Sequence, residues 1–382
     1  MTTPIRLQLS LALHAFLVWV ALADNFAVIV SSSRYWHNYR HAANALSVYT
    51  TVRRLGIPDS NIILMSADEV ACDPRNPLPG EVHFDMSPQR ANLYSGSVQV
   101  DYGGREVNVG VLLQVLTGRH PASTPRSKRL ASGRGSTVLL YMTGHGGDEF
   151  LKFHDQEELL AADLAAALQQ MHLAGRYKEL LVIVDTCQAS SLFSRITAPS
   201  IIGIGTSKPG ESSYAHFADP GIGVHLADQF TYHMYNFLTP LRPGSNATLQ
   251  QLMDNARRKG MLSTIVPWAS KAGGRQPSQV RVMEFFSAVE ASPADVGGYY
   301  HSQATVVEGQ EGLAVVAGRK PMGQQHLLKS HPDVAGKDSC GATDVGDLAH
   351  ANGAEEDRAH PGDSMEAEGT SLYSMLLHAP CL

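Results

Sequence analysis

Cysteine is scarce in this chain of 382 residues, which has four: Cys72, Cys187, Cys340 and Cys381. Four cysteines are too few to hold a fold of this length together by disulfides. No two of them stand at a C-x-x-C spacing, so the commonest pattern of a zinc site is missing. Pairing of Cys340 with Cys381 stays open, and each of the other two cysteines has to be judged from its own surroundings.

An excess of basic charge is also lacking. The net charge is −6, and residues 291–382 alone contain 13 acidic and 5 basic residues, so residues 1–290 are close to neutral. A nucleic-acid partner is therefore not expected. The acidic segment has little Ile or Phe, which predicts a low-complexity, disordered tail over 291–382. It contains no run of 18 apolar residues that would predict a membrane helix.

The first 23 residues have the pattern of a secretory signal peptide. Arg6 precedes an apolar stretch over 7–22, and Ala21-Leu22-Ala23 has the small-residue pattern of a cleavage site. A first buried helix is the alternative. Entry into the secretory pathway would make Asn246, in the sequon Asn-Ala-Thr, available for glycosylation.

Apolar runs predict an α/β domain over residues 24–290. Short continuous runs are typical of strands buried on both faces of a parallel sheet, and periodic apolar positions predict helices between them. The predicted strands are 25–31, 61–65, 137–142, 180–184, 201–207 and 280–286, with a hairpin off the main sheet over 98–109. The predicted helices are 39–55, 111–116, 157–172, 222–238 and 249–261. The expected fold is a mostly parallel sheet with helices on both faces.

Two of these strands end in residues that could carry chemistry. The run 180–184 leads into Asp185-Thr186-Cys187-Gln188, and the run 137–142 leads into Thr143-Gly144-His145-Gly146. Taken singly, such a cysteine is usually a buried apolar side chain and such a histidine is usually structural. Neighbouring strands would bring them together as a thiol and its base. Gly146 would then allow close approach of a substrate and offer its N–H to an oxyanion, with the N–H of Cys187 as a second donor.

These two motifs resemble those of caspase-fold cysteine peptidases, and most closely those of GPI-anchor transamidase catalytic subunits, which are relatives of legumain. Further segments agree with the resemblance: 33–41, 56–60, 71–77, 116–119, 123–130 and 222–226. The match covers about residues 24–290. Legumains tend to differ at the active residues, with an acidic residue before His-Gly and with Glu-Ala-Cys at the nucleophile. The long polar tail also differs from the many family members that end in a transmembrane helix.

The resemblance implies a caspase-like fold and a transamidase reaction that needs no cofactor. Cys187 would attack near the C-terminus of a precursor protein, and the amine of a GPI glycolipid would resolve the resulting thioester. His145 would act as base and then as acid, oriented by Asn38. Capping of the helix that begins near Tyr39 is the alternative role for Asn38. The expected partners are the other subunits of a transamidase complex in the endoplasmic reticulum lumen, which would attach the chain to the membrane.

Other residues receive roles from the resemblance or from their position. The resemblance implies that Asp59 and Asp101 hold a structural divalent cation such as Ca²⁺, although two carboxylates alone do not define a site. It also implies a disulfide from Cys72 to a partner subunit. Thr206 and Ser207 follow the next strand and are expected, from topology alone, to line the substrate pocket. His37 and His41 are expected to lie at a solvated helix start rather than to form a metal pair.

Two other functions remain open from the sequence. One is a legumain-like endopeptidase in which water is the acceptor. The other is a non-catalytic binding subunit that keeps the fold, against which the presence of both Cys187 and His145 argues.

Overall fold

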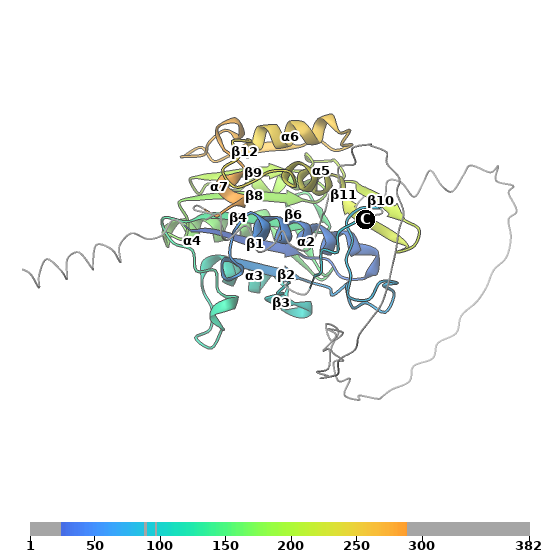
Figure 1. Cartoon of the computed structure of the whole chain (residues 1–382). Coiled ribbons are helices and arrows are strands. Elements are labelled where there is room, and N and C mark those ends of the chain that lie inside the picture. Colours follow the sequence, from blue (N-terminus) through green and yellow to red (C-terminus); the bar gives the residue numbers. More distant parts are fainter. Residues whose placement is uncertain (1–23, 88–89, 96–97, 289–382) are drawn as a thin grey trace, which may run out of the picture.

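The computed structural model describes residues 24–87, 90–95 and 98–288. The proposed signal peptide, the acidic tail, Cys340 and Cys381 lie outside these residues. The described residues form an α/β domain built on a seven-stranded sheet, whose strands follow the order β12-β9-β8-β4-β1-β2-β3 (Figure 1). The sheet strands are β1 (Asn25–Ser31), β2 (Ile62–Ser66), β3 (Tyr102–Gly103), β4 (Thr137–Thr143), β8 (Glu179–Asp185), β9 (Ile201–Gly205) and β12 (Val266–Ala269).

All neighbouring strands in this sheet are parallel, apart from β12, which pairs antiparallel with β9. The prediction of a mostly parallel sheet is confirmed. Alternate side chains of each central strand point to opposite faces, because successive Cβ atoms on a strand alternate. Ile29, Leu139 and Ile183 enter one buried cluster, while Val28 and Leu140 enter the other.

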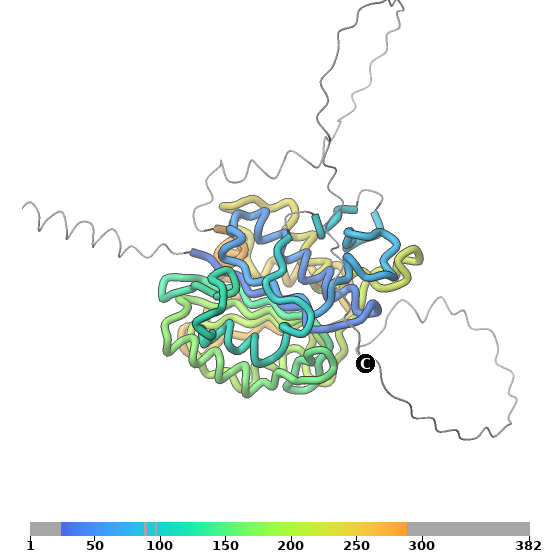
Figure 2. Tube along the Cα trace, turned by 90° about the horizontal axis from the view of Figure 1, so that it is seen from below, coloured from blue at the N-terminus to red at the C-terminus, as the bar shows by residue number. Residues whose placement is uncertain are grey.

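Helices cover both faces of the sheet, which explains why its central strands are almost continuously apolar. Viewed from below, the sheet lies between the two layers (Figure 2). Residues of α2, α5, α6 and α7 pack into one cluster, and residues of α3 and α4 pack into the other. The helices are α2 (Tyr39–Arg54), α3 (Val109–Thr117), α4 (Ala161–Leu173), α5 (Gln229–Leu238), α6 (Leu249–Arg258) and α7 (Met283–Phe286).

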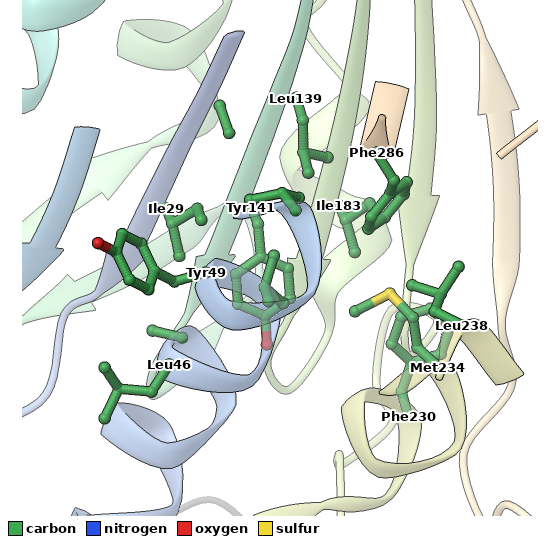
Figure 3. Close-up of a cluster of buried hydrophobic side chains, with 14 of the residues drawn as sticks. Ile29, Leu46, Tyr49, Leu139, Tyr141, Ile183, Phe230, Met234, Leu238 and Phe286 are labelled. Carbon is green, nitrogen blue, oxygen red and sulfur yellow. The ribbon is translucent and has the colours of Figure 1, made fainter. Parts of the chain in front are cut away.

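The first cluster fixes α2 and α5 against the sheet beside the ends of β1, β4 and β8. Figure 3 shows Tyr141 and Ile183 from the sheet, Leu46 and Tyr49 from α2, and Phe230 from α5 packed together. Tyr141 is fully buried, and its hydroxyl pairs with Thr231 Oγ1 at 2.7 Å. This packing sets the position of the polar residues that follow the strands.

Several predicted elements were wrong in type. Residues 157–160 are strand β7 (Glu157–Leu160) of a small sheet with β5 (Gly146–Gly147) and β6 (Phe150–Phe153), and helix α4 starts only afterwards. Likewise, β11 (Val224–Asp228) pairs with β10 (Ala215–Asp219) before α5 begins. In both cases a short strand runs directly into a helix, so the two together had a helical pattern.

The predicted hairpin over 98–109 and the predicted last strand are also corrected. Tyr102–Gly103 is the parallel edge strand β3 of the main sheet, and Gly104–Glu106 forms a 3-10 turn instead of a returning strand. Residues 280–286 contain the short helix α7, with one isolated bridge from Arg281 to Thr248. Phe285 and Phe286 are buried there without strand pairing.

Among the helices of the described residues, none combines the length and apolar character needed to cross a membrane.

Candidate active site

The strands that precede His145 and Cys187 are direct neighbours in the sheet. β4 pairs in parallel with β8, and their last residues, Thr143 and Asp185, are paired with each other. His145 and Cys187 each follow two residues later, so they leave the same edge of the sheet at matching positions. Neighbouring strands are about 4.8 Å apart, and the carboxyl edge of a parallel sheet is where such folds bind ligands.

His145 is held by a side chain from a distant part of the sequence. Its Nε2 is 2.8 Å from Asn38 Oδ1, and Asn38 Nδ2 donates to the carbonyl of Arg34 at 2.7 Å. The second bond orients the amide, because a carbonyl can only accept, so the oxygen of Asn38 must face the ring. Nε2 therefore bears the hydrogen. Nδ1 is buried without a hydrogen-bond partner, and its lone pair is left to accept a proton.

The alternative role of Asn38, capping a helix, is not seen. Asn38 ends the 3-10 helix η1 (Trp36–Asn38) and stands at the N-cap position of α2. Its side chain makes no capping hydrogen bond to that helix. The amide is 2 % exposed and faces His145 instead.

The surroundings of His145 favour its neutral form. Burial lowers its pKa to about 4, and the positive charge of Arg40 acts in the same direction. The ring meets His41 edge to face at 5.0 Å, and burial lowers the pKa of His41 well below its ordinary value. His41 is 1 % exposed, so the expectation of a solvated helix start was wrong for this residue. At neutral pH, His145 can accept a proton.

The segment around Cys187 is held by the loop that follows β9. Ser213 N–H lies 3.2 Å from Cys187 Sγ, and Gln188 N–H donates to the carbonyl of Glu211 at 2.9 Å. Gln188 has a φ of 53°, in the left-handed region that non-glycine residues seldom adopt. Cys187 and Cys72 are both disulfide-bonded in this structure, so the chemistry discussed below belongs to the reduced thiol of Cys187.

Thr206 and Ser207 lie beneath this segment and are fully buried. The hydroxyl of Ser207 donates to the carbonyl of Thr186 at 2.7 Å and accepts from the N–H of Ala189 at 3.0 Å. Ser207 therefore holds the chain on both sides of Cys187. Contact of Thr206 or Ser207 with substrate stays a prediction. The contacts of Ser207 in the structure support the backbone around Cys187.

Gly146 lies where a side chain would not fit. A Cβ on it would approach Thr186 Oγ1 to 2.6 Å and the carbonyl of Phe150 to 2.8 Å. Lys152 N–H donates to the carbonyl of His145 across the β5–β6 pair. Hydrogen-bonded and non-hydrogen-bonded pairs alternate in an antiparallel ladder, so the next pair, Gly146 with Leu151, is a non-hydrogen-bonded one. At such a position the N–H points away from the partner strand. The Gly146 N–H is therefore directed out of the small sheet.

Two buried carboxylates connect the Cys187 and His145 sides of the site. Asp185 accepts from Ser213 Oγ at 3.3 Å and from Thr231 Oγ1 at 2.5 Å. Asp228 accepts from Arg40 Nε at 3.1 Å and from Asn44 Nδ2 at 2.6 Å.

Burial, and then the charge of Asp228, raises the pKa of Asp185 to about 7. Burial likewise raises the pKa of Asp228, against the opposing effect of Arg40. Through Ser213 and Arg40, this network reaches both Cys187 and His145. Sequence reasoning missed the role of Arg40 and Asp228, and their only sequence signal is that both fall in or beside segments that match the family.

Asp59 and Asp101 do come together, away from Cys187 and His145. Both line a cavity of about 360 Å³ that also includes Asn61, Gln99 and two arginines, Arg126 and Arg129. Burial raises the pKa of Asp101 to about 6 and the charge of Asp59 adds to this, although the Leu64 N–H bond opposes it. No group of three or more His, Cys, Asp or Glu side chains suited to a metal occurs within the described residues.

The remaining predicted positions are on loops. Cys72 is partly buried in the loop after β2, against the first core cluster. Asn246 is exposed, in the loop before α6, which leaves it accessible for glycosylation. Thr248 of the same sequon caps α6 through its side chain.

The chain is similar to a family model and to several named proteins. The model of the Peptidase C13 family matches residues 25–288. A protein of Homo sapiens named GPI-anchor transamidase is 47% identical over 266 residues, covering 70% of this chain and 67% of its own length. A protein of the same name from Saccharomyces cerevisiae is 45% identical over 284 residues, covering 73% and 69%. The corresponding Schizosaccharomyces pombe protein is 46% identical over 269 residues, covering 70% of each chain. Among solved structures, caspase-1 from Spodoptera frugiperda matches with a TM-score of 0.36 at 10% identity, covering 67% of this chain and 86% of that one.

Proposed function

Because the chain belongs to the Peptidase C13 family, we propose that it is a cysteine-dependent transamidase that transfers precursor proteins to a GPI glycolipid. The observation that carries this proposal is the 45–47% identity to relatives named GPI-anchor transamidase, over about 70% of the chain. The comparisons give no corresponding support to a legumain-like endopeptidase. The pairing of β4 with β8 supports the proposal, because His145 and Cys187 follow these two strands at the same edge of the sheet.

In the first half-reaction, Cys187 Sγ attacks the carbonyl carbon of a residue near the C-terminus of the precursor. His145 Nδ1 accepts the thiol proton, because Asn38 occupies Nε2 and leaves Nδ1 as the free basic nitrogen. The tetrahedral intermediate collapses when the C–N bond breaks. The departing amine of the C-terminal signal takes the proton from His145, and a thioester remains on Cys187.

In the second half-reaction, the amine of the glycolipid attacks the thioester carbon. Its proton passes to His145 Nδ1, the C–S bond breaks, and the proton returns to the sulfur of Cys187. Burial lowers the pKa of His145, so the imidazole is neutral at physiological pH and its Nδ1 can take up the proton in each half-reaction.

The negative charge that develops on the carbonyl oxygen needs hydrogen-bond donors. We assign this role to the N–H of Gly146, which points away from β6, and to the N–H of Cys187 as the second donor. The absence of a side chain at Gly146 allows the His145 and Cys187 segments to pack closely through Thr186.

The reaction as proposed requires no cofactor, and a divalent cation such as Ca²⁺ would have a structural role. Asp59 and Asp101 would hold it, with amide oxygens of Asn61 and Gln99 in the same cavity. Burial, and to a smaller extent the charge of Asp59, raises the pKa of Asp101, and a cation there would offset both effects by stabilising the carboxylate. Ca²⁺ titration followed by thermal unfolding tests this role: the wild type should gain stability, and Asp101→Asn should not.

We propose that the chain works in the lumen of the endoplasmic reticulum after removal of residues 1–23. Its partners would be other transamidase subunits, one of them bonded through Cys72 in place of the disulfide that this residue forms in the structure, together with the precursor C-terminus and the GPI glycolipid. Affinity purification followed by non-reducing electrophoresis tests the partner bond. Wild type should show a reducible adduct that Cys72→Ser abolishes, and an adduct that persists in the variant would exclude Cys72 as the bonded residue.

The decisive experiment is complementation of cells that lack GPI-anchor transamidase. The full-length chain should restore GPI-anchored proteins at the cell surface, while Cys187→Ala and His145→Ala should not. Matched expression of the three proteins, checked by immunoblot, is the control. Failure of the wild type, or full rescue by Cys187→Ala, would overturn the assignment.

A further inference from the structure

A second cavity lies at the same edge of the sheet as His145, on the side away from Cys187. It measures about 350 Å³ and includes residues that follow β1, β2 and β3, which continue the sheet beyond β4. Its polar lining consists of Arg34, Ser66, Asp68, Glu69 and Tyr94. The carboxyl ends of parallel strands are where α/β folds bind ligands, and the mechanism above uses none of these side chains.

Arg34 provides the cationic group of this cavity. Its guanidinium packs against the ring of Tyr35, 5.6 Å from the centroid, and forms no hydrogen bond or ion pair within the described part of the chain. Its side chain is partly buried. An arginine held in this way offers several N–H donors to an anion, and a phosphate fits them best because two oxygens can be bound side by side.

The carboxylates beside Arg34 already accept hydrogen bonds from other groups. Asp68 accepts the N–H of Tyr35 at 2.5 Å and that of Glu69 at 2.9 Å. Glu69 accepts the hydroxyl of Tyr94 at 3.4 Å. None of these contacts involves Arg34, so its N–H donors are left for a ligand, and the carboxylates can accept hydrogen bonds from hydroxyl groups of the same ligand.

Arg34 is also connected to the catalytic base. Its carbonyl accepts from Asn38, whose oxygen binds His145. In the proposed reaction, the leaving amine takes a proton from His145 and the acceptor amine gives one to it. Both amines must therefore approach on the His145 side of Cys187. In the strand order β8-β4-β1-β2, that side leads towards the cavity.

We propose that Arg34 binds a phosphate group of the amine acceptor, while the rest of the acceptor extends into the cavity over β1, β2 and β3. This inference rests on the proposed transamidase function and names the acceptor subsite for it. When the amine attacks the thioester, Arg34 holds the phosphate in place and the amine nitrogen remains beside His145 Nδ1. An acceptor with a phosphate is then favoured over water and over a bare amine.

The test uses the complex purified from cells through a tag on the full-length chain. A precursor peptide is the acyl donor, and two acceptors that differ only in the phosphate, ethanolamine and phosphoethanolamine, are compared. The amide products are measured by mass spectrometry. The variants are Arg34→Gln, Arg34→Lys, and Arg258→Gln as a control at an exposed arginine on α6. Side-chain changes at Arg34 keep the carbonyl that orients Asn38.

Wild type should use phosphoethanolamine at least about tenfold better than ethanolamine, in kcat/KM for the acceptor. Arg34→Gln should lower kcat/KM for phosphoethanolamine about tenfold and change kcat/KM for ethanolamine little, as expected for loss of one charge-assisted contact. Arg34→Lys should regain part of the loss, and Arg258→Gln should match wild type. Equal losses for both amines, or no preference by wild type, would overturn the acceptor subsite. Hydrolysed peptide with no amide from either amine would instead overturn the transamidase function itself.

Discussion

Replacement of Asn38 by alanine tests whether the amide positions His145, the proposed catalytic base. The change removes the acceptor 2.8 Å from His145 Nε2 and leaves a buried N–H without a partner. An unpaired buried donor costs about 1–3 kcal/mol. If that cost is felt mainly in the transition state, peptide cleavage should slow by about 5- to 150-fold. Helix α2 should still begin normally, because the side chain does not cap it.

Asn38→Asp separates orientation from electrostatics. The carboxylate can still accept from Nε2, but its charge favours the imidazolium form of His145. In wild type, a pKa of about 4 keeps His145 neutral down to mildly acidic pH. In the variant that pKa rises, so the base is already protonated at pH 5–6 and activity is lost there. At pH 8 the variant should recover much of the wild-type rate.

The assay is release of the C-terminal fragment from a precursor peptide by the purified complex, followed from pH 4 to pH 8. The acid limb of kcat/KM reports the pKa of the free enzyme's base. Thermal unfolding of each variant measures any general loss of structure. Cleavage by folded Asn38→Ala within twofold of wild type, or an unmoved acid limb in Asn38→Asp, would refute the positioning role.

Three further predictions concern the surroundings of the site. Gly146→Ala should lower kcat at least tenfold and destabilise the fold by about 1–3 kcal/mol, because its Cβ would meet the Phe150 carbonyl at 2.8 Å. The control in kinetics and thermal unfolding is Gly133→Ala, whose Cβ meets nothing within 4 Å. Asp185→Asn should flatten the pH dependence of stability. Because the native pKa of Asp185 is raised from 3.8 to about 7, the wild-type free energy of unfolding should fall as the pH rises through that interval, with a slope of up to about 1.4 kcal/mol per pH unit. Urea titrations at pH 4 and pH 8 would show whether the slope persists in the variant. Asn246→Gln should remove a glycan-dependent mobility shift seen after endoglycosidase treatment while leaving activity intact, since Asn246 is exposed in a loop. An unchanged shift would place the glycan elsewhere.

The sequence by itself determined the centre of the sheet. The continuous apolar runs at 25–31, 137–142 and 180–184 can be buried on both faces only within a covered parallel sheet. Their lengths agree closely with β1, β4 and β8. The positions of His145 and Cys187 after two such runs followed from the same pattern, because side chains just beyond parallel strands leave one edge of the sheet.

The peripheral elements were decided by tertiary pairing. β7 and β11 run straight into α4 and α5. The periodicity of apolar residues cannot distinguish a strand of four or five residues from the first turns of the helix that follows it. β12 contains Pro267, which is tolerated because β12 is an edge strand. The apolar residues 280–286 pack into the core as a helical turn, which burial alone does not distinguish from a strand.

The contacts that hold the site together belong to the tertiary structure as well. Asn38 and His145 are 107 positions apart, and sequence alone left helix capping as an equal alternative for Asn38. The folded chain decided between the two, because α2 packs against β4 and brings the amide to the imidazole. The pKa of His145 and the placement of Arg34 beside an open cavity likewise depend on which side chains surround them. Residue types determined what chemistry this chain can perform, and packing determined which residues act together.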